Sequence, residues 1–189
     1  ARGVGRSESQ ETCPGAHLRT GLRGRIRALD TSLLVLGGAR SGKSRFAVAS
    51  QPPRATIAFI ATAQAGDIDM AARIARHRAE RPGYWRTVEE PFDLVPHLGA
   101  LVGKVDGAIV DCLTLWVSNR LLRGDSDKSI LDDAEALGAL IERRPLPITL
   151  VSNEVGEGVH PETAAGLRFR DLLGLVNQRV AKACDRVVL

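Results

Sequence analysis

The segment LLVLGGARSGKS (residues 33–44) places a glycine-rich loop directly after an apolar run. Four consecutive apolar residues without polar alternation are typical of a strand buried on both faces of a parallel sheet. The loop matches the Walker A pattern G-x-x-x-x-G-K-S, and residues 45–49 after it favour a helix. A match that follows a strand and precedes a helix is far more specific than the eight-residue pattern alone. The segment therefore predicts a phosphate-binding loop of a nucleotide site.

The residue types of this loop explain how it would hold a nucleotide. Glycines let successive backbone N–H groups point at phosphate oxygens, and the following helix adds its positive N-terminal end. We expect Lys43 to reach the β- and γ-phosphates as a catalytic residue, and the Ser44 hydroxyl to bind Mg²⁺. The predicted nucleotide-binding residues of the loop are Gly37, Gly38, Ala39, Arg40, Ser41, Gly42, Lys43 and Ser44.

Composition and charge narrow the class of protein. Of the 189 residues 44% are hydrophobic and 25% charged, and no apolar run is long enough to span a membrane. Three cysteines without metal-type spacing favour a reducing, cytoplasmic location. The net charge is +4, but residues 1–31 hold six arginines against three acidic residues, so the remainder is nearly neutral and does not favour a nucleic-acid partner. We expect residues 1–31 to be a disordered basic leader and residues 32–189 to be one domain.

Further strands and helices alternate along the chain. Apolar runs predict strands at 57–61, 107–111, 147–151 and 186–189, and residues 85–88 are a short strand candidate. Periodic segments predict helices at 67–80, 113–122, 129–142 and 168–184, and a weaker helix follows residues 89–91 and ends at Leu98. This alternation predicts an α/β fold, a doubly wound parallel sheet with helices on both faces. Ligands bind such sheets at the carboxyl ends of the strands, where Thr62, Ala63 and Gln64 follow one strand. Asp111 ends another, as in a Walker B pattern, and would support Mg²⁺.

Two further clusters have alternative interpretations. His77 is surrounded by arginines, which would lower its pKa and keep the imidazole neutral. It is either an incidental imidazole on a solvated basic helix face or a nucleophile that attacks phosphorus. Arg168 and Arg170 are either phosphate-clamping lid residues or an ordinary charged start of a helix.

The chain resembles a known family, the bifunctional adenosylcobinamide kinase/adenosylcobinamide-phosphate guanylyltransferases of cobalamin biosynthesis. The resemblance covers residues 33–189 and is carried by GGARSGKSR (37–45), FIATAQ (59–64), DMAARIARHRAERPGYWRTVEEP (69–91), VDCLTLWVSN (110–119) and residues 151–189. A series of such segments in this order is much more specific than the Walker A pattern alone. Residues 1–31 have no counterpart in the family.

The resemblance implies a P-loop NTPase with a RecA-like, mostly parallel sheet, and two reactions. ATP or GTP phosphorylates adenosylcobinamide, a corrinoid, and GMP is then transferred from GTP through a guanylylated histidine, which falls on His77, to give adenosylcobinamide-GDP. The resemblance also implies a homotrimer. Beyond the P-loop, the implied GTP contacts are Thr62, Ala63, Gln64, Glu80, Arg81, Pro82, Gly83, Glu89 and Asp111. The alternatives are a simple P-loop small-molecule kinase without a covalent nucleotide and a P-loop switch or adaptor ATPase.

Overall fold

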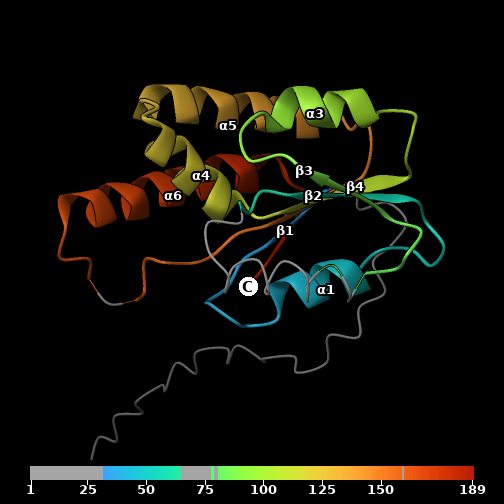
Figure 1. Ribbon diagram of the computed structural model, residues 1–189, viewed down its shortest axis with the longest axis horizontal. Helices are drawn as coiled ribbons and strands as arrows, with labels where there is room; N and C mark the ends of the chain where they lie inside the picture. Colours follow the sequence, from blue (N-terminus) through green and yellow to red (C-terminus); the bar gives the residue numbers. More distant parts are fainter. Residues whose placement is uncertain (1–31, 65–77, 79–80, 159) are drawn as a thin grey trace, which may run out of the picture.

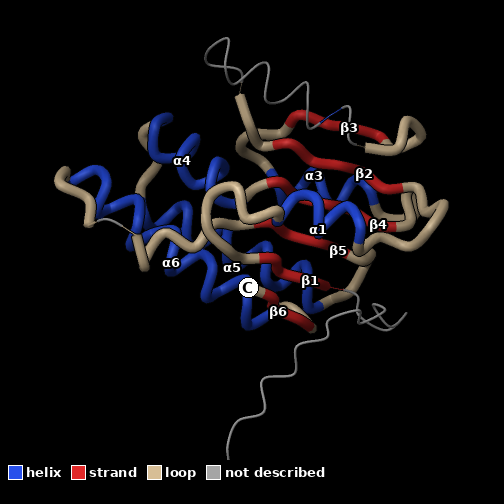
Figure 2. The backbone as a smooth tube through the Cα atoms, turned by 90° about the horizontal axis from the view of Figure 1, so that it is seen from below, coloured by secondary structure: helices blue, strands red, loops and turns tan. Residues whose placement is uncertain are grey.

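A single six-stranded parallel sheet forms the centre of the computed structural model, which describes residues 32–64, 78, 81–158 and 160–189. The sheet order is β3-β2-β4-β5-β1-β6, and every neighbouring pair is parallel (Figure 2). The strands are β1 (Ser32–Val35), β2 (Ile57–Ala61), β3 (Arg86–Glu89), β4 (Gly107–Asp111), β5 (Ile148–Val151) and β6 (Arg186–Val188). The expected α/β class is confirmed.

Helices cover both faces of this sheet (Figure 1). The short helix α1 (Lys43–Ala49) lies on one face, and the other face carries α3 (Leu94–Leu101), α4 (Leu113–Arg123), α5 (Asp127–Glu142) and α6 (Ala164–Ala183). The helix predicted at 67–80 and the leader 1–31 lie outside the described residues. No helix in the described part of the chain is long and apolar enough to cross a membrane.

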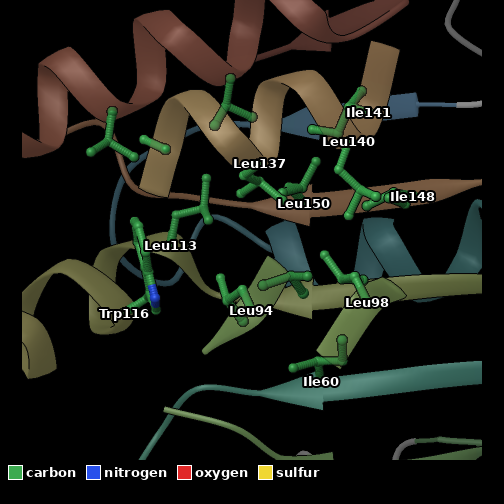
Figure 3. Packing of buried hydrophobic residues seen from close by; sticks show 14 of the residues in the cluster. Ile60, Leu94, Leu98, Leu113, Trp116, Leu137, Leu140, Ile141, Ile148 and Leu150 are labelled. Carbon is green, nitrogen blue, oxygen red and sulfur yellow. The ribbon is translucent and has the colours of Figure 1, made fainter. Parts of the chain in front are cut away.

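The two faces of the sheet have separate cores, which explains why the central strands β1, β2, β4 and β5 consist mostly of apolar residues. Ile60 and Leu150 point toward α3, α4 and α5 and pack with Leu98, Trp116 and Leu137 (Figure 3). Their strand neighbours contribute to a smaller cluster on the α1 face, consisting of Leu33, Val35, Ala47, Ile57, Phe59, Ala61, Ile109 and Val151. Because both faces are buried, the residues of these central strands have no solvated side that would select polar side chains, whereas the edge strands β3 and β6 are partly exposed.

Two helix starts are fixed by hydroxyl caps. Ser126 caps α5 by accepting a hydrogen bond from the Ser129 amide, and Thr163 caps α6 by accepting one from the Gly166 amide. The helix predicted from residue 168 therefore begins earlier, at Ala164, because the sequence-based boundary missed this threonine cap. Arg168 lies within α6 rather than at its start.

A buried arginine joins α4 to α5. The Arg120 guanidinium donates to the carboxylates of Asp125 and Asp133 and to the Ser129 hydroxyl, and it lies 5.4 Å from the centre of the Trp116 ring. Burying a cation is costly unless it is paired, and here each carboxylate comes from the turn or from the first turns of α5. The short connection between α4 and α5 is therefore held by a buried, paired arginine.

Candidate nucleotide-binding site

The loop between β1 and α1 has the backbone conformation expected of a phosphate cradle. Gly37 and Gly42 have φ values of 142° and 95°, a region that glycine adopts without strain. A Cβ atom on Gly37 would lie 3.0 Å from the Ser41 hydroxyl oxygen. The Lys43 ammonium folds back across the loop and donates to the Gly38 carbonyl at 2.5 Å. The loop thus surrounds a cationic group at the N-terminal end of α1, which is an arrangement suited to phosphate.

The sheet order places the other predicted segments in one row along the carboxyl edge. Moving away from β1 and its P-loop, the row passes the ends of β5, β4, β2 and β3 (Figure 2). At about 4.8 Å per strand, Asp111 at the end of β4 lies about 10 Å along the sheet from β1, and Glu89 at the end of β3 about 19 Å. Glu89 is exposed and Asp111 is half-buried. The predicted GTP contacts after β2 and β3 require a nucleotide with its phosphates in the P-loop to extend along this row.

Thr62 is fully buried and its hydroxyl is engaged by the protein. The hydroxyl oxygen accepts a hydrogen bond from the Cys112 amide at 2.7 Å and donates one to the Cys112 carbonyl at 2.8 Å. The Thr62 side chain therefore joins the ends of β2 and β4. The next residues face solvent increasingly, since Ala63 is half-buried and Gln64 is exposed.

The segment 81–83 packs beside β2 and β3. The Arg81 guanidinium lies 3.3 Å from the centre of the Phe59 ring and donates to the Thr87 hydroxyl at 3.3 Å. Pro82 begins a turn in which its carbonyl accepts from the Trp85 amide, and Gly83 is exposed. Arg81 therefore covers the α1 face of the sheet as well as being a predicted GTP contact. His77 and Glu80 lie outside the described residues.

The loop after β5 supports the P-loop directly, a contact that sequence reasoning did not predict. The Glu154 amide donates to the Gly37 carbonyl at 3.1 Å. The preceding residue is held from two helices, because the Thr114 hydroxyl accepts from the Asn153 amide at 2.8 Å and the Asn177 side chain donates to the Asn153 carbonyl at 3.1 Å. The only sequence signal for these contacts is the presence of polar residues within apolar helix faces.

The two arginines of the lid hypothesis pair with protein groups. Arg168 contacts the Asp127 carboxylate at 2.6 Å and also donates to the Asp125 carbonyl. Arg170 pairs with Asp171 at 2.8 Å and lies 3.1 Å from the His160 Nδ1 atom. These contacts hold both arginine side chains against residues of α5 and α6 and of the loops that precede these helices.

Cys112 lies beside Asp111 at the end of β4. Burial, and to a smaller extent the Asp111 carboxylate, raise the pKa of the Cys112 thiol to about 11. Burial, followed by the charge of Asp185, raises the pKa of Cys184 to about 12. Both thiols are therefore protonated at neutral pH, and neither has the thiolate character of a nucleophilic cysteine.

We expect these two cysteines to react slowly in the folded protein. In a Cys13→Ser variant at pH 8, alkylation should be slower than that of a free thiol by about 100-fold for Cys112 and about 1,000-fold for Cys184, because the raised pKa values leave little thiolate. The rate should return to that of a free thiol in denaturant, which removes the burial. Mass spectrometry of timed iodoacetamide reactions measures both rates. Rapid alkylation of Cys112 under native conditions would contradict the burial assigned to it.

Together the fold and the site define a class of protein. A P-loop between the strand β1 and the helix α1, a carboxylate at the end of β4 and a parallel sheet covered on both faces are the features of a P-loop nucleotide-binding protein. The chain belongs to the cobinamide kinase / cobinamide phosphate guanyltransferase family, whose model matches residues 33–189.

Curated relatives support the same assignment over most of the chain. The bifunctional adenosylcobalamin biosynthesis protein CobP of Pseudomonas aeruginosa is 47% identical over 157 residues, which are 82% of this chain and 89% of that protein. The bifunctional adenosylcobalamin biosynthesis protein CobU of Salmonella typhimurium is 41% identical over 169 residues, or 83% of this chain and 93% of that protein. The protein of the same name from Escherichia coli is 40% identical over the same lengths.

Proposed function

We propose that this chain phosphorylates adenosylcobinamide with ATP or GTP and then transfers GMP from GTP to the product, giving adenosylcobinamide-GDP in cobalamin biosynthesis. The observation that carries the proposal is the P-loop itself, in which Lys43 folds over the cradle formed between Gly37 and Gly42. The membership in a family of cobinamide kinases and guanyltransferases supplies the substrate class. The nearly neutral charge of residues 32–189 does not favour nucleic acid as a partner.

The described residues have distinct roles in holding the triphosphate. The P-loop amides and Lys43 bind the phosphates, and Thr62–Gln64, Arg81–Gly83 and Glu89 are the proposed contacts farther along the row. Ser44 and Asp111, both half-buried, provide a hydroxyl and a carboxylate oxygen. This oxygen donor set suits Mg²⁺, which binds few protein ligands and completes its shell with water and phosphate. When bound, Mg²⁺ offsets the charge of the phosphate oxygens.

The two proposed reactions differ in their nucleophile. In the kinase step the substrate hydroxyl oxygen attacks the γ-phosphorus, and the nucleoside diphosphate leaves. In the guanylyl step a ring nitrogen of His77 attacks the α-phosphorus of GTP, an N–P bond forms and pyrophosphate leaves. A phosphate oxygen of the phosphorylated corrinoid then attacks the same phosphorus and displaces the imidazole. Only the second reaction needs His77.

Intact-mass analysis of protein incubated with Mg²⁺ and GTP labelled at the α-phosphate tests this division. We expect a GMP adduct that is acid-labile and alkali-stable. The adduct should be absent in His77→Ala and retained in His17→Ala, a control outside the matched residues. The ATP-dependent kinase step should persist in His77→Ala within a few fold. Kinase activity without an adduct in the wild type would instead establish the alternative, a simple small-molecule kinase.

We also propose, by extension from the family, that the protein acts as a homotrimer in the cytoplasm. Light scattering of the purified protein measures the oligomeric state. We expect a mass three times that of the 20.3 kDa chain.

A further inference from the structure

Asn119 of α4 is a buried amide that holds two separate segments of the carboxyl edge. Its side-chain nitrogen donates to the Thr62 carbonyl at 2.8 Å and to the Pro91 carbonyl at 3.3 Å. Thr62 follows β2, and Pro91 lies in the loop after β3. Both N–H groups of the amide therefore hold main chain rather than side chains, which fixes the course of the two segments directly.

Other hydrogen bonds converge on the same point. The Thr62 amide donates to the Asp111 carbonyl at 3.1 Å, and its hydroxyl bonds both backbone groups of Cys112. The Glu90 amide donates to the Ala61 carbonyl at 3.0 Å, so the loop after β3 is also held to β2. We call Thr62, Cys112 and Asn119 the edge clamp. This clamp joins the carboxyl ends of β2, β3 and β4.

The P-loop is held by different contacts. Its supporting bond runs from the Glu154 amide to the Gly37 carbonyl, and the Leu36 amide before the loop donates to the Val188 carbonyl. Strand β5 separates β1 from β4, so among the described residues the edge clamp makes no hydrogen bond to the P-loop. The edge clamp and the P-loop are thus held by different residues, although α4 contributes to both, through Asn119 at the β2 and β3 ends and through Thr114 at the loop after β5.

We propose that Asn119 is a positioning residue for the nucleoside end of the bound GTP. The inference rests on the proposed function, because it requires a nucleoside triphosphate along this edge. With the phosphates in the P-loop, the ends of β2 and β3 lie about 14–19 Å along the sheet, where the nucleoside of an extended triphosphate would be. Replacing Asn119 by an apolar residue removes the donor from the buried Thr62 carbonyl and from the carbonyl of the half-buried Pro91, and movement of the segments at these two residues relieves that cost.

Binding measurements with GTP and with inorganic triphosphate distinguish contacts to the nucleoside from contacts to the phosphates. For the full chain with Mg²⁺, we expect Asn119→Ala to raise the Kd for GTP at least tenfold and to change the Kd for inorganic triphosphate less than twofold. Asn119→Ser, whose hydroxyl retains one donor, should fall between wild type and Asn119→Ala. The matched control is Val117→Ala on the same helix, which removes buried apolar atoms but no hydrogen bond to the edge. Both Kd values of this control should stay within twofold of wild type well below its Tm.

The outcomes separate a positioning role from a structural one. Equal changes in the two Kd values, or the same behaviour in Asn119→Ala and Val117→Ala at equal loss of Tm, would show that Asn119 only stabilises the fold. A wild-type protein that binds GTP no more tightly than inorganic triphosphate would also overturn the inference. These readouts do not depend on the GMP adduct, so a failure of the guanylyl-transfer proposal is recognised separately.

Discussion

Replacing Lys43 by alanine is expected to lower kcat/KM about 10²–10³-fold in both the kinase and the guanylyl-transfer reactions. Both reactions begin with a bound triphosphate, and Lys43 is the P-loop cation whose ammonium folds back across the loop. The ammonium already lies against the Gly38 carbonyl inside the loop, so the charge is held in place before a nucleotide arrives. Its loss removes an interaction that the transferring phosphate uses in the transition state.

Two further variants and a GTP affinity measurement test the role of Lys43. Lys128→Ala removes an exposed lysine that pairs with Asp132 one turn away on α5, so both activities should remain within twofold of wild type. Lys43→Arg keeps the charge but not the shape of the group, and we expect it to recover little activity. Unchanged GTP affinity in a folded Lys43→Ala protein would contradict the assignment of the loop.

The parts of the fold that sequence predicts well are those set by local pattern. Strand β1, the P-loop and the helix α1 follow from an apolar run, glycine spacing and helix formers within residues 33–49. Asp111 could be placed at a strand end for the same reason. Each of these predictions needs only neighbouring residues, because strands buried on both faces and a glycine-rich loop leave direct signals in the sequence.

The parts that sequence did not predict depend on partners distant along the chain. Asn119 and Thr62 are 57 positions apart, and only the sheet order brings their atoms together. The same holds for the stacking of Arg81 on Phe59 and for the bond from Glu154 to Gly37. A polar residue inside an apolar helix signals that a buried partner exists, but it does not identify that partner.

Trp116 of α4 is both a core residue and a hydrogen-bond donor to a distant loop. An aromatic residue within a mostly apolar helix is typical of a core position, and the Trp116 side chain is 1% exposed. Its indole N–H also donates to the Phe92 carbonyl at 2.7 Å, in the loop that Asn119 holds at Pro91. Helix α4 therefore supports this loop through two side chains, one of which also fills the core.

Trp116→Ala is accordingly expected to lower the free energy of unfolding by about 3–5 kcal/mol, because it leaves a large cavity and an unpaired carbonyl. At roughly 2–4 °C per kcal/mol for a domain of this size, Tm should fall by about 6–20 °C. Trp116→Phe keeps most of the buried volume and should cost less. The control is Trp85→Phe, since the Trp85 indole nitrogen is buried without a hydrogen-bond partner among the described residues. Thermal unfolding followed by circular dichroism should therefore show a larger loss for Trp116→Phe than for Trp85→Phe, and the reverse order would contradict the hydrogen bond to Phe92.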